Sequence, residues 1–264
     1  MKVHDITGFL ENLAPLHYQE SYDNAGLLTG QFDMDITGAM ISLDATEAVI
    51  DEAIKRKCNL VISHHPIIFK GLRKINGKNY IERAIIKAIK NDIALYAIHT
   101  NLDNVYDNGV STEICDRLGL KNTRVLVPKL DADQDGKVGL GSIGDFDFVM
   151  NDTECLAFIK DRMEVKVIRH TVLLESRIKT VAVCGGSGAS LLPAAIAQGA
   201  DMYISADFKY HEFFDANNEI IIADIGHFES EQFTIKLLHK ILSKKFSNFA
   251  LFCTSVNTNP VNYF

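Results

Sequence analysis

The amino-acid sequence predicts an α/β protein made of two related lobes. Apolar runs of the length of a buried strand alternate along the chain with segments of helical periodicity, which is typical of parallel sheets covered by helices. One strand–helix–strand pattern occurs twice. In addition, histidine and carboxylate residues follow several of the predicted strands, and α/β proteins gather their ligands at such strand ends.

The repeated pattern involves residues 53–63 and residues 195–205, which align at one constant offset. A strand precedes each copy, at 39–43 in the first and at 180–184 in the second. The identical positions are Ala53 and Ala195, Ile54 and Ile196, Ile62 and Ile204, and Ser63 and Ser205. The shared order favours two related βαβ units. Right-handed crossovers would bring the polar clusters that follow both copies to the carboxyl edges of two sheets, and two such edges facing each other would form a cleft.

A boundary between the lobes is expected near Val127-Pro128, ahead of the polar stretch 129–139. The first lobe would contain residues 1–127 plus 223–264, and the second lobe residues 128–222. A terminal helix and a strand at 249–253 would return the chain to the first lobe. The apolar residues of this helix recur at helical spacing and are Phe233, Leu237, Leu238, Ile241 and Leu242.

Two adjacent histidines, His64 and His65, close the apolar run Leu60-Val61-Ile62. Adjacent side chains on a strand point to opposite faces, so one metal ion could use both imidazoles only if the backbone bends there. Pro66 favours such a bend, because it disfavours continued pairing and restrains the residue before it. Two neighbouring imidazoles that diverge at a strand end suit a pair of metal ions better than a single ion.

Two further segments repeat this arrangement. The predicted strand 94–98 runs into His99 and Asp103, and the predicted strand 220–224 precedes His227 and Glu231. The last two residues are four apart, which places them on one face of a helix. An isolated histidine after a strand is usually a structural residue, but three such segments together favour metal ligation. Histidine and carboxylate ligands suit Zn, Fe, Mn, Ni or Co rather than Ca or a structural thiolate site.

Seven motifs in a specific order and spacing carry a resemblance that runs nearly from end to end of the chain. They are Tyr22-Asp23-Asn24-Ala25-Gly26-Leu27, Ser42-Leu43-Asp44-Ala45-Thr46, Ser63-His64-His65-Pro66, His99-Thr100-Asn101-Leu102-Asp103, Asp207-Phe208-Lys209-Tyr210-His211, Gly226-His227-Phe228-Glu229-Ser230-Glu231 and Thr258-Asn259-Pro260. With these motifs the chain resembles the dinuclear-metal family of GTP cyclohydrolase 1 type 2 homologues, also called Nif-three-like proteins.

This resemblance implies a set of metal ligands, a fold and an assembly. The implied ligands of two divalent metal ions are His64, His65, Asp103, His227 and Glu231. The implied fold has two α/β lobes with the dinuclear metal site in the cleft between them. The implied assembly is a ring-shaped homohexamer, a trimer of dimers. Some members carry a further domain near the middle, for which this chain has no room.

Composition restricts the class of protein. The net charge of −7 offers no general attraction to nucleic acid or to an anionic membrane. Five cysteines without a CxxC pair indicate a reducing compartment. Asp5 and Glu11 interrupt the region where a signal peptide would be apolar, and no apolar run approaches membrane-spanning length. We therefore expect a cytoplasmic protein that acts on a small molecule rather than on nucleic acid.

Other polar residues are candidates for supporting roles. Asp207 and His211 follow the second repeat, where they would form either an internal acid–imidazole pair or a catalytic pair that contacts substrate or shuttles protons. Asp44 and His99 are expected behind the ligands, orienting them. The glycine-rich segment 185–188 follows a strand and opens a helix, so it is either a tight turn or a contact for an anion.

Two metals bridged by a carboxylate polarise an electrophile and generate hydroxide from a shared water. Glu231 or Asp103 is the natural bridge, because a carboxylate offers two oxygens. The leading interpretation is a hydrolase of a C–N, phosphoester or amide bond in a small nucleotide-like substrate. The family name suggests opening of the guanine imidazole ring of GTP. The alternative is a non-catalytic metal-binding scaffold or protein-interaction module.

Overall fold

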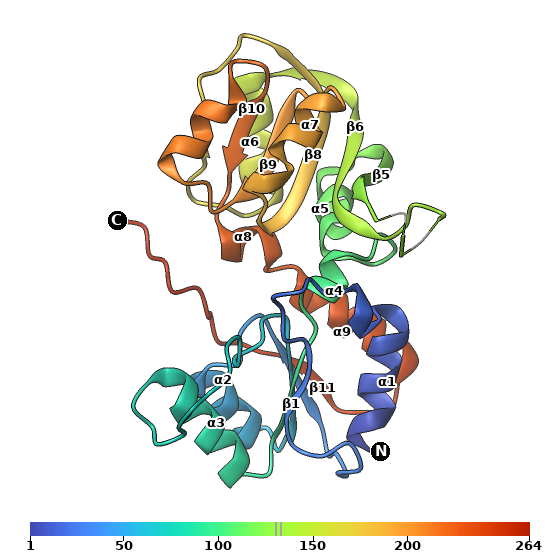
Figure 1. Ribbon diagram of the computed structural model, residues 1–264, viewed down its shortest axis with the longest axis vertical. Coiled ribbons are helices and arrows are strands. Elements are labelled where there is room, and N and C mark those ends of the chain that lie inside the picture. The colour runs from blue at the N-terminus through green and yellow to red at the C-terminus, as the bar shows by residue number, and fades with distance from the viewer. Residues whose placement is uncertain (130, 133) are drawn as a thin grey trace. The chain divides into compact units, whose positions relative to one another are not determined.

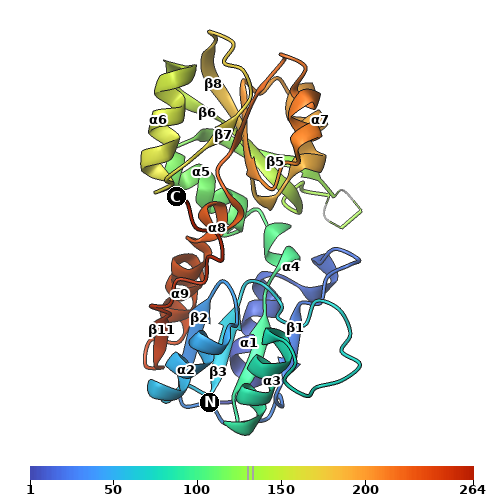
Figure 2. The same ribbon diagram turned by 90° about the vertical axis from the view of Figure 1, so that its left-hand side faces the viewer.

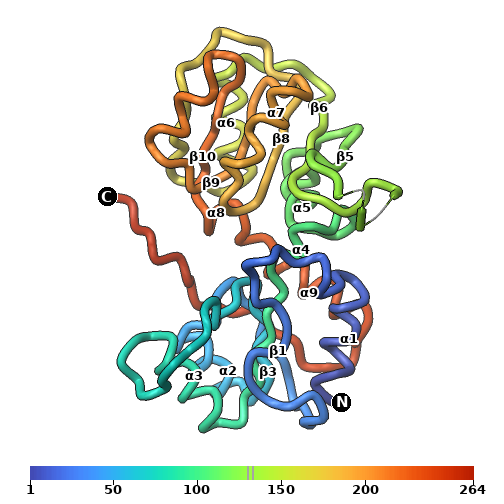
Figure 3. Tube along the Cα trace, viewed as in Figure 1, coloured from blue at the N-terminus to red at the C-terminus, as the bar shows by residue number. Residues whose placement is uncertain are grey.

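A computed structural model describes residues 1–129, 131–132 and 134–264 of the chain (Figure 1). The chain forms two compact units, each with its own sheet. Unit 1 contains Met1–Leu102 and Thr234–Pro260, and unit 2 contains Asp103–Phe233 and Val261–Phe264. In Figure 3 the two segments of unit 1 are coloured blue to teal for residues 1–102 and red for residues 234–260. Among the described residues, no helix combines the length and the apolar character needed to cross a bilayer.

These units differ in their boundaries from the lobes expected from the sequence. The segments 103–127 and 223–233 lie in unit 2 rather than with the first lobe. The physical reason is strand pairing, since 121–128 forms an edge strand of the second sheet and 221–224 pairs with two further strands of that sheet. The return of the chain to the first sheet begins only at Thr234.

Unit 1 is a five-stranded sheet with helices on its faces. Its elements are α1 (Val3–Leu13), η1 (Leu16–Tyr18), β1 (Gly26–Thr29), β2 (Ala39–Ser42), α2 (Glu47–Lys55), β3 (Leu60–Ser63), α3 (Tyr80–Lys90), β4 (Ala94–Ala97), α4 (Thr100–Asp103), α9 (Thr234–Lys245) and β11 (Leu251–Cys253). The strand order is β1-β4-β3-β2-β11. All neighbours are parallel except β1, which runs antiparallel to β4. The helix α4 ends at the first residue of unit 2.

Local sequence explains the helices and the buried strands of unit 1. Thr46 caps α2 by accepting a hydrogen bond from the Val49 N–H, and Asn79 caps α3 by accepting one from the Glu82 N–H. The strands β2, β3 and β4 are buried at every position, and each large apolar side chain removed from water contributes about 1.5–3 kcal/mol. Continuous burial is typical of parallel strands covered on both faces. The last helix, α9, lies beside α1 (Figure 1). The ring centroids of Phe9 in α1 and of Phe246, directly after α9, are 5.6 Å apart.

Unit 2 is a six-stranded mixed sheet. Its elements are α5 (Val110–Leu118), β5 (Lys121–Pro128), β6 (Gly139–Asn151), α6 (Asp152–Arg162), β7 (Arg169–His170), β8 (Arg177–Ser187), η2 (Ala189–Leu191), α7 (Leu192–Ala197), β9 (Met202–Ala206), η3 (Tyr210–Ala216), β10 (Ile221–Asp224) and α8 (His227–Glu231). The strand order is β5-β6-β8-β9-β10-β7. The three central strands β8, β9 and β10 are parallel, and the outer pairings are antiparallel.

Helices cover both faces of the second sheet, with α6 on one face and α7 on the other (Figure 2). One apolar layer joins α5 and α6 to the sheet through residues such as Cys115, Ile159 and Val181. A second apolar layer joins α7 and η3 to the opposite face. We call it the η3 layer, and its buried members are Leu126, Ile143, Ala182, Cys184, Leu191, Leu192, Ala195, Ala200, Tyr203, Phe208, Ala216, Ile220 and Ile222.

The repeated strand–helix–strand pattern is present in both units. In unit 1, β2, α2 and β3 form a parallel βαβ unit, and in unit 2, β8, α7 and β9 form another. Both copies therefore end at the carboxyl edge of a parallel strand pair, followed by His64 in the first and Asp207 in the second. This arrangement places polar residues of both motifs at the edges where α/β proteins bind ligands.

Candidate metal-binding residues

The register of the first sheet gathers the polar residues that follow three strands. Ser42, Ser63 and Ala97 lie side by side at the ends of β2, β3 and β4. The next residues of each segment therefore start from the same edge, and these include Asp44 and His99. Backbone hydrogen bonds from His64 N–H to the Ser42 carbonyl and from His65 N–H to the Leu43 carbonyl fix the histidine segment on this edge.

Three imidazoles converge there. The strand β3 ends at Ser63 and the chain bends at His64 and His65, so these two neighbouring side chains no longer point to opposite faces. Ring centroids lie 5.0 Å apart for His64 and His65, 5.3 Å for His64 and His99, and 5.4 Å for His65 and His99. One nitrogen of each ring lies within 4.8 Å of the others. His99, expected behind the ligands, thus lies among the candidate ligand rings themselves.

An oxygen acceptor holds the Nδ1 atom of each of these rings. His64 Nδ1 lies 2.8 Å from the Ile98 carbonyl oxygen, His65 Nδ1 lies 2.9 Å from Asp44 Oδ1, and His99 Nδ1 lies 2.7 Å from Asp23 Oδ1. A carbonyl or carboxylate can only accept, so Nδ1 carries the proton and Nε2 carries the lone pair that a metal requires. Asp44 therefore has the orienting position expected for it.

Asp23 is the supporting residue that the sequence did not assign. Burial would raise its pKa, but hydrogen bonds from His99 and Thr100 outweigh burial and lower the pKa to about 2. The carboxylate is thus ionised throughout the physiological range and fixes the His99 ring. The only sequence signal for this role of Asp23 was its place in a motif rich in polar residues. Its partner His99 lies 76 residues away along the chain, so the pairing could not be predicted from local sequence.

In unit 2, His227 and Glu231 lie on one face of α8, one turn apart, as their spacing predicts. Gly226 precedes the helix as its N-cap. His227 Nε2 lies 3.2 Å from Glu231 Oε2, and His227 Nδ1 lies 2.8 Å from Asp207 Oδ2. Burial would lower the pKa of His227, but its hydrogen bonds with Asp207 and Glu231 outweigh burial and raise the pKa to about 11. His227 Nε2 and Glu231 Oε2 are therefore close enough to share one cation, either a proton or a metal ion.

Asp207 and Gly186, which contact His227 and Glu231 respectively, both have a left-handed backbone conformation. Asp207 has φ of 58°, a left-handed conformation that costs a non-glycine residue about 1–2 kcal/mol. Gly186 has φ of 63°, and a Cβ added there would lie 2.3 Å from Glu231 Oε1. The Gly186 N–H donates to Ser230 Oγ at 2.9 Å. The glycine-rich segment therefore serves as a tight turn packed against Glu231, and this N–H group is already engaged by the protein.

Asp103 lies in the same unit as Glu231. Burial raises the pKa of the Cys184 thiol to about 12, and the negative charges of Asp103 and Glu231 add to this effect. Both carboxylates therefore act electrostatically on the same side chain of β8. Of the five ligands implied by the resemblance, His64 and His65 are brought together in unit 1, and His227, Glu231 and Asp103 belong to unit 2.

Asp207 and His211 do not form the expected pair. The described residues include no hydrogen bond between them, and Asp207 bonds to His227 instead. Asp207 lies in a left-handed conformation before the Lys209 N-cap of η3, so helical spacing does not apply to it. The His211 ring is exposed and contacts Tyr210 and Phe214.

The available donors fit transition-metal ions. Imidazole nitrogens combined with carboxylate oxygens suit Zn, Fe, Mn, Ni or Co. Four of the imidazoles have Nδ1 held by an oxygen, the arrangement that metal-ligating histidines commonly show. A thiolate site is disfavoured, because burial raises the pKa values of Cys115, Cys155 and Cys184.

Comparison with known proteins finds similarity over nearly the whole chain. A family model described as Duf34/NIF3 (NGG1p interacting factor 3) matches residues 1–260. A Campylobacter jejuni protein named GTP cyclohydrolase 1 type 2 homolog is 34% identical over 100% of both chains. One of the same name from Clostridium acetobutylicum is 32% identical over 100% of this chain and 99% of its own.

Solved structures with the same architecture are also similar. A Staphylococcus aureus protein has a TM-score of 0.92 at 29% identity, with 100% of this chain and 99% of that chain covered. A Bacillus cereus protein described as related to NIF3 has a TM-score of 0.90 at 25% identity, with the same coverage. The sequence motifs and the fold agree with these comparisons, and the chain belongs to the Duf34/NIF3 family.

Proposed function

We propose that the chain binds two divalent metal ions and uses them to hydrolyse a small, anionic, nucleotide-like substrate. The observation that carries the proposal is the anchoring of four imidazoles through Nδ1, which presents Nε2 for ligation. In unit 1 the ligands would be His64 and His65, with His99 beside them. In unit 2 they would be Asp103, His227 and Glu231.

Bound metal ions of this kind polarise an electrophilic group and lower the pKa of a bound water. The residues of the chain position and tune the ligands. Asp23 and Asp44 hold the imidazole planes of unit 1, and Asp207 does the same for His227. Glu231, buried with its tip against Gly186, supplies the negative charge that would balance a cation.

An anionic substrate is favoured by the loop that follows the histidine motif. Residues 70–78 contain Lys70, Arg73, Lys74 and Lys78 and no acidic residue, although the chain as a whole carries a net charge of −7. None of these four cations makes an ion pair with a described residue. The loop starts at Phe69, whose ring lies 6.1 Å from the His99 ring and 6.2 Å from the ring of Tyr22. A local excess of cations beside a candidate site attracts anionic ligands, and exposed aromatic rings suit a base.

The names of the relatives add a candidate reaction. Several are called GTP cyclohydrolase 1 type 2 homolog, and GTP is an anionic nucleotide of the class that this loop favours. Hydrolytic opening of the guanine ring is therefore the first reaction to test. Other nucleotides and phosphoesters follow, because two-metal sites commonly stabilise such displacements.

The test starts with metal analysis of protein purified without added metal. We expect about two equivalents of divalent metal per chain in the wild type and loss of one or both in Glu231→Gln, which keeps size but removes charge. Nucleotides and phosphoesters are then screened, with His65→Ala as the inactive control. Two tightly bound equivalents in Glu231→Gln would contradict the ligand assignment, and equal turnover by wild type and His65→Ala would contradict the catalytic assignment.

One observation favours a second candidate function, a metal-binding scaffold without turnover. The acid–base pair expected of Asp207 and His211 is not formed, because Asp207 is engaged by His227. A scaffold would show full metal loading and no turnover on any screened substrate. An enzyme would show turnover that disappears when metal is removed by a chelator and returns when metal is added.

A further inference from the structure

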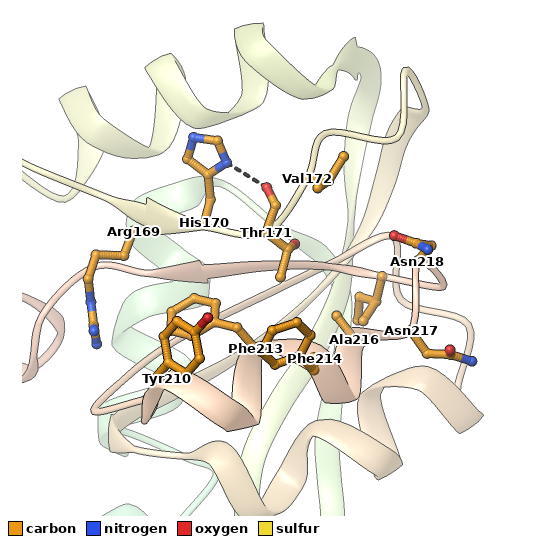
Figure 4. Close-up of a pocket in the computed structure, with 11 residues that line it drawn as sticks. Arg169, His170, Thr171, Val172, Tyr210, Phe213, Phe214, Ala216, Asn217 and Asn218 are labelled. Atoms are coloured by element: carbon orange, nitrogen blue, oxygen red, sulfur yellow. Dashed lines mark hydrogen bonds between the residues drawn. The ribbon is translucent and has the colours of Figure 1, made fainter.

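Unit 2 contains a slot that does not involve the candidate metal ligands. It has a volume of about 640 Å³ and lies between β7 with the residues after it and η3 (Figure 4). The residues that line it are Arg169, His170, Thr171, Val172, Tyr210, Phe213, Phe214, Ala216, Asn217, Asn218 and Ile220. A volume in this range holds a small organic ligand.

The slot lies where the η3 layer ends, at the edge of the second sheet. Ala216 and Ile220 belong to the buried part of this layer, and Phe213 packs against it. β7 has only two residues and pairs with β10 at the edge of the sheet, so the layer stops there. Three large apolar side chains remain exposed at the rim, with exposed fractions of 72% for Val172, 73% for Tyr210 and 67% for Phe214. Exposed aromatic residues grouped around a hollow are characteristic of binding sites.

The aromatic wall offers ring faces at two orientations. Tyr210 and Phe214 have ring centroids 5.6 Å apart with an interplanar angle of 74°. Figure 4 shows these rings and Phe213 along one side of the slot, opposite Thr171 and Val172. A planar ring entering the slot could therefore stack on one side chain and meet the edge of the other.

A polar group lies at each end of the slot, but the net charge is small. At one end, Arg169 Nη2 donates to the Asp224 carboxylate and to the Phe208 carbonyl oxygen, and its guanidinium lies 5.3 Å from the Phe213 ring centre. Its Nε and Nη1 groups make no hydrogen bond within the described part of the chain. At the other end, Asn218 presents an exposed amide (Figure 4). Because Asp224 balances the charge of Arg169, the slot offers hydrogen bonds without a surplus of positive charge.

We propose that this slot binds a planar heteroaromatic molecule of nucleoside size that carries no phosphate. The aromatic wall provides stacking, and each end provides hydrogen-bonding groups for the ring edge or the sugar. The ion pair with Asp224 argues against polyphosphates, which would need uncompensated cations. This site is independent of the proposed metal-dependent function, since none of its lining residues is a candidate ligand.

The protein contains no tryptophan, which allows a direct fluorescence test. The fluorescent nucleoside 2-aminopurine riboside is titrated with full-length protein, because stacking on Tyr210 or Phe214 quenches its emission. Guanosine and adenosine are used as competitors, and the 5′-monophosphate of the probe tests the role of charge. Phe214→Ala and Tyr210→Ala should each weaken binding by about 5- to 150-fold, the range for loss of one base–aromatic stack.

Phe148→Ala is the matched control, because Phe148 is also an exposed phenylalanine of unit 2, with an exposed fraction of 53%. It should leave the dissociation constant unchanged, and circular dichroism should show all three variants folded. Absence of quenching at millimolar protein would overturn the proposal, as would unchanged binding by Phe214→Ala. Monophosphate binding ten times tighter than nucleoside binding would overturn the charge argument. Metal-stripped protein should bind the probe equally well, so failure here and failure of the metal-dependent function are distinguishable.

Discussion

Replacing Gly186 by alanine tests whether the turn after β8 positions the buried carboxylate of Glu231. The added Cβ would lie 2.3 Å from Glu231 Oε1 and 3.2 Å from His227 Cε1. Ordinary contacts are longer, so the carboxylate must retreat by about 1 Å. Metal–oxygen bonds tolerate deviations of only about 0.2 Å. We therefore expect Gly186→Ala to weaken metal binding in unit 2 by at least about 10- to 100-fold.

The backbone strain of this substitution can be separated from the displacement of Glu231. Gly199 has φ of 73°, close to the 63° of Gly186, but a Cβ there meets nothing within 4 Å. Gly199→Ala is therefore the matched control for strain alone. Both variants should lose about 1–2 kcal/mol of unfolding free energy, since a side chain in the left-handed region costs about this much. Only Gly186→Ala should also lose metal, because the tip of a flexible glutamate can move without a large further cost in stability.

The measurement combines metal analysis after dialysis with urea unfolding of both variants. The expected result is a full metal content in Gly199→Ala and loss of at least one equivalent in Gly186→Ala, at similar unfolding free energies. Wild-type metal content in Gly186→Ala would refute the argument, because it would mean that Glu231 can leave its position without consequence. A large loss of stability in Gly186→Ala alone would show that the turn is structural rather than positional.

Four further predictions concern metal affinity, turnover, the pH dependence of stability and the assembly. Asp207→Asn should lower metal affinity about 10- to 100-fold in a chelator competition, because it weakens the bond that orients His227. His211→Ala should keep full metal content and, if this residue shuttles protons, lower turnover by about 10²–10⁴-fold. Burial would raise the pKa of Glu52, but hydrogen bonds from Thr254 and Ser255 outweigh it and lower the pKa from 4.5 to about 2. The ionised carboxylate therefore stabilises the fold above pH 4.5, and this contribution disappears as the pH falls towards 2. In urea unfolding, Glu52→Gln should therefore be less stable than the wild type above pH 4.5 and equally stable near pH 2. Light scattering should report about six chains per particle if the implied trimer of dimers forms, and a monomer would contradict it.

The elements that the sequence predicted correctly are those with a local signal. Continuous apolar runs bounded by polar residues predicted β3, β4 and β10, and helical spacing predicted α9. The unit boundary was misplaced because Val127-Pro128 marks no linker. It ends β5, an edge strand where proline is tolerated, and its pairing with β6 is a contact that local composition does not encode.

For the candidate metal-binding residues too, local sequence patterns predicted some features, whereas contacts between distant segments could not be predicted. The spacing of His227 and Glu231 predicted their common helix face, and the strand ends predicted that His64, His65 and His99 share an edge. The partners that hold the imidazoles were harder to predict. Asp23 bonds to His99 across 76 residues and Asp207 to His227 across 20, which are distances along the chain that local sequence patterns do not encode.

The division of unit 1 into two chain segments has a consequence for biosynthesis. The outer edge of β2 is covered by β11, which leaves the ribosome only after all of residues 103–233 have been translated. At 5–20 residues per second this delay is about 7–25 s. During that time a nascent chain presents an incomplete sheet with an unpaired strand edge, a state open to aggregation and to binding by chaperones. Unit 2, nearly continuous in sequence, can fold in this interval, so the second sheet would be complete before the first.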